Sequence, residues 1–167
     1  MSVTPTYDGA CLVRIAIPGV SGGALMDLGY SEDGVTPDLN AMWADVHGDE
    51  NGGNEGPPIE VQWLGEIAVV RMTLTKFDVA VATLVSQRTA AAAGGTAGVL
   101  DTPGRMMFTE NNAMRLLLKT PQRPLNFTRA FPRGPISANK SVKYQKFICE
   151  FECHKDANGV LYNATIS

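Results

Sequence analysis

The sequence has few of the residues on which disulfide frameworks, metal centres and many active sites depend. Its 167 residues include only three cysteines and two histidines, and the odd cysteine count argues against a disulfide framework. No apolar run approaches the roughly 20 residues that a membrane-spanning helix needs. The N-terminus has no basic segment followed by an apolar core, so nothing marks the chain for secretion. We therefore expect a soluble protein, without a membrane partner, that assembles or functions in a cytoplasm.

The cysteines are better explained as core residues than as ligands. Cys149 and Cys153 lie in KYQKFICEFECHK, which alternates like a β-strand. Four residues of strand separate them by roughly 13 Å on one face, whereas a disulfide needs Cα atoms within about 7 Å. A zinc site with His154 is equally awkward, because that side chain would point to the opposite face. We expect buried free thiols.

No pattern in the sequence indicates catalysis or a cofactor. His47 and His154 each lie beside a predicted turn without a nucleophile motif nearby, and the glycines at 94, 95 and 98 lack the spacing of a phosphate-binding loop. The acidic loop HGDENGGNEGPP, residues 47–58, does not fit the EF-hand pattern; of the required positions only Glu60 matches. We expect no enzyme, no cofactor and no regular metal site, with an irregular cation site in residues 45–55 as an alternative to an ordinary acidic loop.

Charge is unevenly distributed along the chain, although the net charge is only -3. Residues 1–66 contain eleven acids and one base, Arg14, whereas the remainder contains thirteen bases and six acids. Between Glu110 and Glu150 there are eight bases and no acid. Three interpretations are open: a well-mixed surface, a nucleic-acid-binding patch, or two complementary surfaces through which copies of the chain meet.

The nucleic-acid interpretation rests on the basic stretch from Arg115 to Lys146. Phe127, Phe131 and Tyr144 are interleaved with its bases and could stack on nucleobases. However, the stretch passes through prolines and several predicted elements, and the pI near 5.3 argues against non-specific binding. A nucleic-acid-binding β-module is therefore kept only as an alternative.

Alternating apolar residues and turn signals predict a mainly β fold. We expect strands over residues 10–17, 39–46, 59–77, 113–120, 125–131, 142–154 and 160–166. The long strand 59–77 is expected to contain a bulge at Leu64-Gly65. Asp33-Gly34 and Asn158-Gly159 each predict a hairpin, because glycine adopts positive φ without steric cost.

One segment has helical rather than strand periodicity. Asp78 is a suitable N-cap, and Val81, Leu84 and Val85 can form one apolar stripe before the glycines at 94 and 95. The sequence therefore predicts a single domain over residues 1–167: an antiparallel β-sandwich or barrel with one short flanking α-helix and long loops. The loop 47–58 and a proline-containing arm, 121–141, are expected to be exposed assembly contacts.

Two stretches resemble a known family. LGYSEDGV, residues 28–35, is followed by DVHGDENGGNEGPPIEVQWLGEIAVVRMTLTKFDVAVA, residues 45–82. This order of turn, acidic glycine-rich loop, long strand and helix resembles structural proteins of tailed-bacteriophage virions, and is most similar to tail tube subunits. The resemblance covers roughly residues 28–88.

The resemblance implies a virion tail protein, assembled in the host cytoplasm, whose hexameric rings stack into a tube. Partners would be further copies of the chain and other tail or head-tail proteins, with DNA passing through the lumen without specific binding. Another virion role, in capsid decoration, head-tail joining or a baseplate, is the alternative. Assembly residues of the loop, Asp49, Glu50, Asn51 and Glu55, would then meet the basic residues Arg129, Arg133, Lys140 and Lys143 across the interface.

Overall fold

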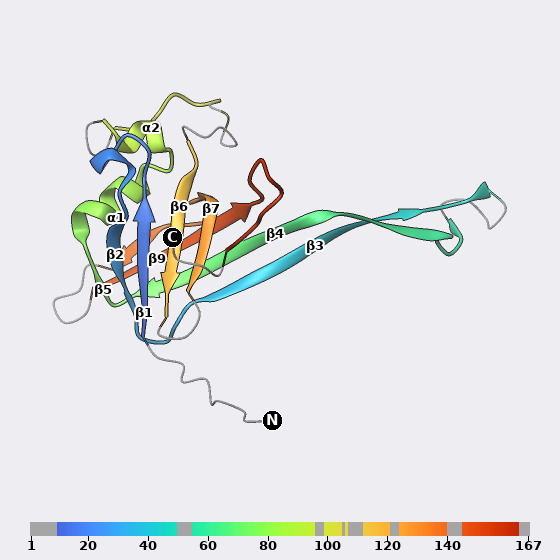
Figure 1. Ribbon diagram of the computed structural model, residues 1–167, viewed down its shortest axis with the longest axis horizontal. Coiled ribbons are helices and arrows are strands. Elements are labelled where there is room, and N and C mark those ends of the chain that lie inside the picture. The colour runs from blue at the N-terminus through green and yellow to red at the C-terminus, as the bar shows by residue number, and fades with distance from the viewer. Residues whose placement is uncertain are drawn as a thin grey trace.

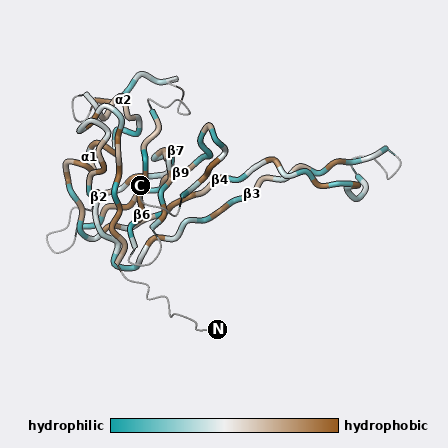
Figure 2. Tube along the Cα trace, viewed as in Figure 1, coloured by the Kyte–Doolittle hydropathy of each residue, from teal (hydrophilic) through white to brown (hydrophobic). Residues whose placement is uncertain are grey.

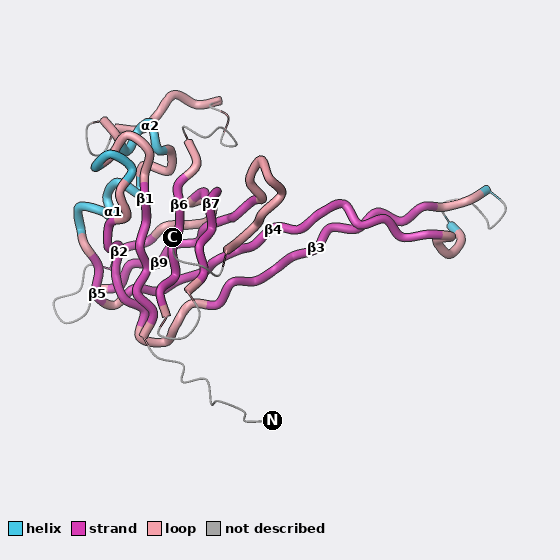
Figure 3. The backbone as a smooth tube through the Cα atoms, in the orientation of Figure 1, coloured by secondary structure: helices cyan, strands magenta, loops and turns pink. Residues whose placement is uncertain are grey.

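The computed structural model describes residues 10–49, 55–95, 99–104, 106, 112–120, 124–139 and 145–163. Strands dominate it and helices are short, which confirms the mainly β prediction (Figures 1 and 3). The elements, in chain order, are β1 Cys11–Ala16, a 3-10 turn η1 Ser21–Gly23, β2 Met26–Ser31, β3 Thr36–Val46, β4 Glu60–Leu74, β5 Lys76–Phe77, α1 Val79–Ser86, α2 Ala90–Ala93, β6 Met114–Lys119, β7 Leu125–Phe131, β8 Ser137–Asn139 and β9 Lys146–His154.

All strands belong to one antiparallel sheet. Its order is β3-β4-β9-β7-β6-β1-β2-β5, and β8 pairs with the beginning of β9. Only Thr75 separates β4, the second strand in this order, from β5, the last. The sheet curls accordingly, but it is not closed into the barrel that was one of the predicted forms.

The hydrophobic core lies inside this curl. Alternate residues of each strand point into it, as in β9, where Phe147, Cys149, Phe151 and Cys153 are buried while Ile148 is exposed. The thiols are free, which confirms the expectation for the cysteines. This period of two is what the pleat of a strand with one covered face requires.

Helix α1 covers part of the core, as its sequence predicted. The Asp78 carboxylate accepts hydrogen bonds from the backbone N–H groups of Ala80 (2.8 Å) and Val81 (3.1 Å). Val81 and Val85 are buried against the sheet. The helix ends at Ser86, and the alanine-rich continuation forms a separate single turn, α2, capped by Thr89.

The two predicted glycine hairpins are wrong in their pairing, although both turns form. The strands flanking Asp33-Gly34 do not pair with each other: β2 pairs with β1 and β5, and β3 pairs with β4. After Asn158-Gly159 the described residues 160–163 do not return along β9 but make one bridge, from Asn163 to Asn126 of β7; residues 164–166 of the predicted strand lie outside the described chain. In both cases the preceding strand already has a neighbour on each edge.

The described part of the predicted arm 121–141 does not project. Residues 132–136 run along β9, where the Gly134 N–H donates to the Glu150 carbonyl (3.3 Å), and β8 then pairs with β9. The remaining residues of that range, 121–123 and 140–141, lie outside the described chain. Instead, the projecting element is the β3–β4 hairpin, which extends far beyond the body (Figure 1). Within the described chain, no helix is both long and apolar enough to cross a bilayer.

Candidate assembly surfaces

The projecting hairpin, residues 39–67, is called the arm from here on; the name no longer refers to the predicted segment 121–141. Eleven residues of β3 pair with β4, from Thr36 opposite Arg71 to Val46 opposite Glu60. The register shifts between Met42, which faces Gly65, and Trp43, which faces Trp63. Leu64 is therefore the extra residue of a bulge, at the position that the sequence predicted.

The bulge determines which side chains share a face. In β4 the core-facing residues of the body are Leu74, Met72, Val70 and Ala68. Beyond the body, cross-strand pairs on this same side are Leu39 opposite Ala68 and Ala41 opposite Glu66, and then, past the bulge, Trp43 opposite Trp63 and Asp45 opposite Val61. The face of the sheet that is buried in the body thus continues along the arm as a mainly apolar face, called the apolar face, which is made by Leu39, Trp43, Trp63 and Val61 and is interrupted by the carboxylates of Glu66 and Asp45.

This apolar face is open to solvent. Trp43 and Trp63 are 60% and 59% exposed, and Leu39 and Val61 are about half exposed. Figure 2 shows hydrophobic segments in both strands of the arm, well away from the body. Large apolar side chains that are grouped on one exposed face, with polar residues around them, mark interaction sites.

The arm has acidic groups but no lysine or arginine. The chain contains no lysine or arginine between Arg14 and Arg71, so the whole arm lies in this gap. Of the predicted interface residues, Asp49 and Glu55 lie at its far end and are exposed. Glu50 and Asn51 lie outside the described residues. The far end, represented by Asp49 and Glu55, is called the arm tip.

The predicted basic residues are not gathered in one place. Arg133 Nη1 donates to both carboxylate oxygens of Glu152 (2.8 and 2.7 Å), and His154 Nε2 lies 2.8 Å from the same carboxylate. Arg129 is the cross-strand partner of His154 in the β7–β9 ladder, but its side chain lines a separate pocket. Lys140 and Lys143 are outside the described residues, so the pairing of acidic and basic residues stays a prediction.

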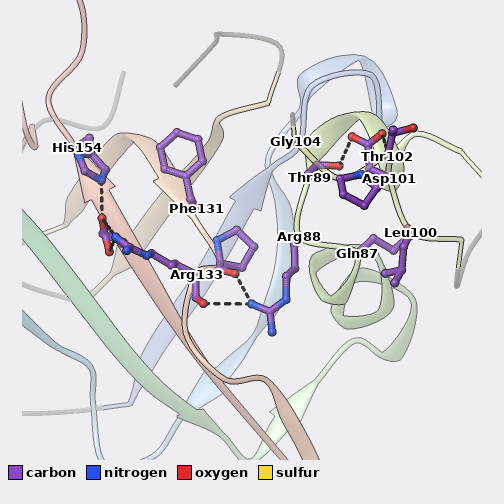
Figure 4. Close-up of a pocket in the computed structure, with 13 residues that line it drawn as sticks. Gln87, Arg88, Thr89, Leu100, Asp101, Thr102, Gly104, Phe131, Arg133 and His154 are labelled. Atoms are coloured by element: carbon purple, nitrogen blue, oxygen red, sulfur yellow. Dashed lines mark hydrogen bonds and ion pairs between the residues drawn. The ribbon is translucent and has the colours of Figure 1, made fainter. Parts of the chain in front are cut away.

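The Arg133–Glu152–His154 cluster borders a cavity of about 600 Å³ between the sheet and the turn joining α1 to α2 (Figure 4). Arg88 closes one side of it by donating from Nη1 to the carbonyls of Pro132 (2.7 Å) and Gly134 (2.8 Å). On the other side the Thr89 hydroxyl donates to Asp101 (2.9 Å). These polar groups already bond to one another, so they tie the helical segment to the sheet.

A second pocket, of about 440 Å³, lies beside β6 and β7 and is called the basic pocket. Its lining includes Arg115, Thr128 and Arg129, together with Pro18, Asp156 and Asn158. Of these residues, only Arg129 is among the interface residues predicted from the charge distribution; Arg115 and Thr128 are not. Trp43 and Trp63 are not among the predicted contacts either, although both alternate with polar residues on strands that flank the acidic loop.

The cysteines and acids do not form a metal centre in the part of the chain that is described. No group of three His, Cys, Asp or Glu side chains converges there. Burial raises the pKa of the Cys149 and Cys153 thiols to about 12. These thiols are core residues, far from the protonation state that metal ligation requires. The cation alternative for residues 45–55 falls partly outside the described chain and stays untested.

No family model and no curated protein matches the chain. Several chains in solved structures are similar to it, and two of them are described here. One, described as the virion of a native gene transfer agent particle, shares 11% identity at a TM-score of 0.48 and covers 92% of this chain and 95% of its own. The other, described as the tail of an empty particle of that kind with C6 symmetry, shares 13% identity at a TM-score of 0.47 and covers 93% and 95%. Similarities of this size do not by themselves assign a function.

Proposed function

We propose that this chain is a structural subunit of a phage-type virion tail, and that copies of it associate through the arm. One observation carries the proposal: the core-facing side of the sheet continues along the arm, where Trp43 and Trp63 are more than half exposed. An apolar face built to the same pattern as a core, but lacking a cover, indicates a partner.

The arm also needs a partner for its own stability. A two-stranded ribbon is at best marginally stable in water, because it has neither a third strand nor a helix packed against it to bury its side chains. Burying one large apolar side chain fully contributes roughly 1.5–3 kcal/mol. Contact with another molecule along the apolar face would therefore both order the arm and supply much of the association energy.

A second copy of the chain is the partner that we propose. The arm and the body are different surfaces, so a contact between the arm of one copy and the body of the next is heterologous. Heterologous contacts propagate, and they give closed rings or open helical arrays according to the rotation between copies. A tail is built from such repeats.

In its finer form, the proposal is a tail tube subunit that forms stacked hexameric rings around a DNA channel. Its support is the resemblance of residues 28–88 to tail tube subunits, together with the absence of lysine and arginine from residues 15–70. Acidic segments near a channel would repel the phosphate backbone and keep DNA mobile. The role is structural, without catalysis or a cofactor, and places the chain in the virion tail after assembly in the host cytoplasm with other tail or head-tail proteins.

Electron microscopy of the purified protein, with its mass measured by light scattering over a concentration series, tests this function. Six-membered rings or hollow stacked tubes are the expected result. A closed ring without stacking would favour a head-tail joining component, and a particle that binds only to preformed capsids would favour a decoration protein. A strict monomer at all concentrations, with no affinity for virion proteins, would overturn the proposal.

A further inference from the structure

We propose that the basic pocket binds the carboxylates at the arm tip of a second copy. This inference rests on the proposed function and adds to it a defined receptor for the arm. It places Arg129 and Arg115 opposite Asp49 and Glu55 of the neighbouring copy.

The pocket is made by an irregularity in strand pairing. In the β6–β7 pair, Met114 lies opposite Ala130 and Leu116 lies opposite Phe127. Arg115 alone therefore faces two residues, Thr128 and Arg129, across a β-bulge. Bulges re-aim side chains that a regular ladder would separate. Here the bulge brings two arginines and a hydroxyl to the lining of one concavity.

The donors of this pocket are only partly used within the chain. Arg115 Nε donates to the Asn126 side chain (2.9 Å), which leaves its terminal nitrogens for another acceptor. Arg129 has no hydrogen bond or ion pair with any described residue. The Thr128 hydroxyl is buried and lacks a partner within the described chain. A buried hydroxyl without a partner is costly, so an incoming acceptor would be stabilised here.

The acid in the pocket does not neutralise these arginines. Asp156 also lines the pocket, but its carboxylate accepts hydrogen bonds from the backbone N–H groups of Asn158 and Val160 (both 2.9 Å). Those bonds hold the turn after β9. Asp156 makes no ion pair with another described side chain. The remaining surplus of positive charge suits a carboxylate, which can bond to a guanidinium in a bidentate manner.

The arm tip has the complementary chemistry. Asp49 and Glu55 are exposed, and no lysine or arginine lies between Arg14 and Arg71 to neutralise them. The ribbon carries the tip away from the body (Figure 1), so the tip of one copy reaches the pocket of another rather than its own. DNA is a poorer fit, because the pocket offers two arginines in a concavity rather than an extended basic tract.

A charge exchange tests the inference. Arg129→Glu and Asp49→Lys should each weaken association by at least about tenfold, measured as the concentration at which oligomers dissociate in light scattering. The double variant should recover most of this loss, because the exchanged charges attract again. Lys76→Glu and Glu32→Lys, which change exposed charges outside the pocket and the arm, are the matched controls. If Arg129→Glu lowers the melting temperature, Arg129→Gln replaces it in the same measurement, because it removes the positive charge without introducing a negative one.

The outcomes separate this inference from the proposed function. If wild-type protein assembles, but the double variant is no better than the single ones or the controls weaken assembly equally, the pocket is not the receptor while arm-mediated assembly stands. If Arg129→Glu instead spares assembly and abolishes salt-sensitive binding of duplex DNA, the pocket binds phosphate and the inference is wrong. A wild-type protein that never associates would overturn both.

Discussion

Trp43 of β3 lies directly opposite Trp63 of β4 on the core-facing side of the sheet, yet the two side chains are 60% and 59% exposed. In the body, the same side of β4 is completely covered from Ala68 to Leu74. One continuous face therefore passes from a buried to an uncovered environment within a single strand. A partner that supplies the missing cover accounts for this change.

Replacing Trp63 with serine should therefore affect association much more than folding. Changes at exposed positions usually alter the free energy of unfolding by no more than about 0.5 kcal/mol, whereas loss of an aromatic anchor from an interface commonly costs about 2 kcal/mol or more. Unfolding in urea and light scattering would measure the two effects. Leu100→Ser, at a 75% exposed position outside the arm, is the control and should change neither. Equal association of the Trp63→Ser and wild-type proteins would contradict an interface on the apolar face.

The sequence predicted the strands better than their neighbours. The predicted range 125–131 coincides with β7, and 113–120 differs from β6 by one residue at each end, because alternation is a local property of the chain. The hairpins at Asp33-Gly34 and Asn158-Gly159 were wrong, because pairing depends on which strand edges remain free. That information is not local to the turn.

The candidate surfaces, like the fold, were predictable only in the features that are local in the sequence. The acidic tip and Arg129 follow from charge distribution, which can be counted along the chain. The grouping of Arg115, Thr128 and Arg129 depends on the β6–β7 register. The exposure of Trp63 could not be predicted from the sequence either. Its segment alternates between apolar and polar residues, and a strand whose apolar face is covered has the same pattern.

Arg88 holds the α1–α2 turn against the sheet at a conformational cost. Its φ is +68°, in the left-handed region, and its guanidinium donates to the carbonyls of Pro132 and Gly134. Arg88→Ala should lose these bonds and keep the strained backbone, lowering the free energy of unfolding by about 1–3 kcal/mol. Arg88→Gly also loses the bonds but relieves the strain. In urea unfolding the wild type should therefore be the most stable, the glycine variant less stable and the alanine variant the least stable. An alanine variant at least as stable as the glycine variant would contradict this account.

Asp78 should stabilise α1 through hydrogen bonding at its N-terminus. Its carboxylate accepts from Ala80 and Val81, and α1 in turn buries Val81 and Val85 in the core. Asp78→Ala should cost about 1 kcal/mol of unfolding free energy. Asp78→Asn keeps an oxygen acceptor and should cost much less. Thermal melting of the two variants distinguishes a cap from a purely electrostatic effect, for which asparagine and alanine would be equally destabilising.

The buried thiols predict both chemical inertness and sensitivity to alkali. Burial raises the pKa of Cys149 and Cys153 from an ordinary 9.0 to about 12, and the neighbouring Glu152 charge adds to the effect at Cys153. Because the thiolate is the reactive form, a maleimide at pH 8 should leave both unmodified in the folded protein. In urea both should react. Rapid labelling of either residue in the folded protein would contradict their burial in the core.

The same pKa shifts give stability a defined pH dependence. Between pH 9 and about 12 the unfolded chain loses protons from these thiols while the folded chain keeps them, so the free energy of unfolding must fall as the pH rises through this range. At pH 10 the expected loss is on the order of 1 kcal/mol for each thiol. Cys149→Ala will be less stable than wild type at pH 8 because it leaves a cavity, but it should lose less further stability between pH 8 and pH 10. Urea unfolding at both pH values isolates the thiol contribution, since the other titrating groups are shared, and parallel losses in the two proteins would show that Cys149 does not contribute.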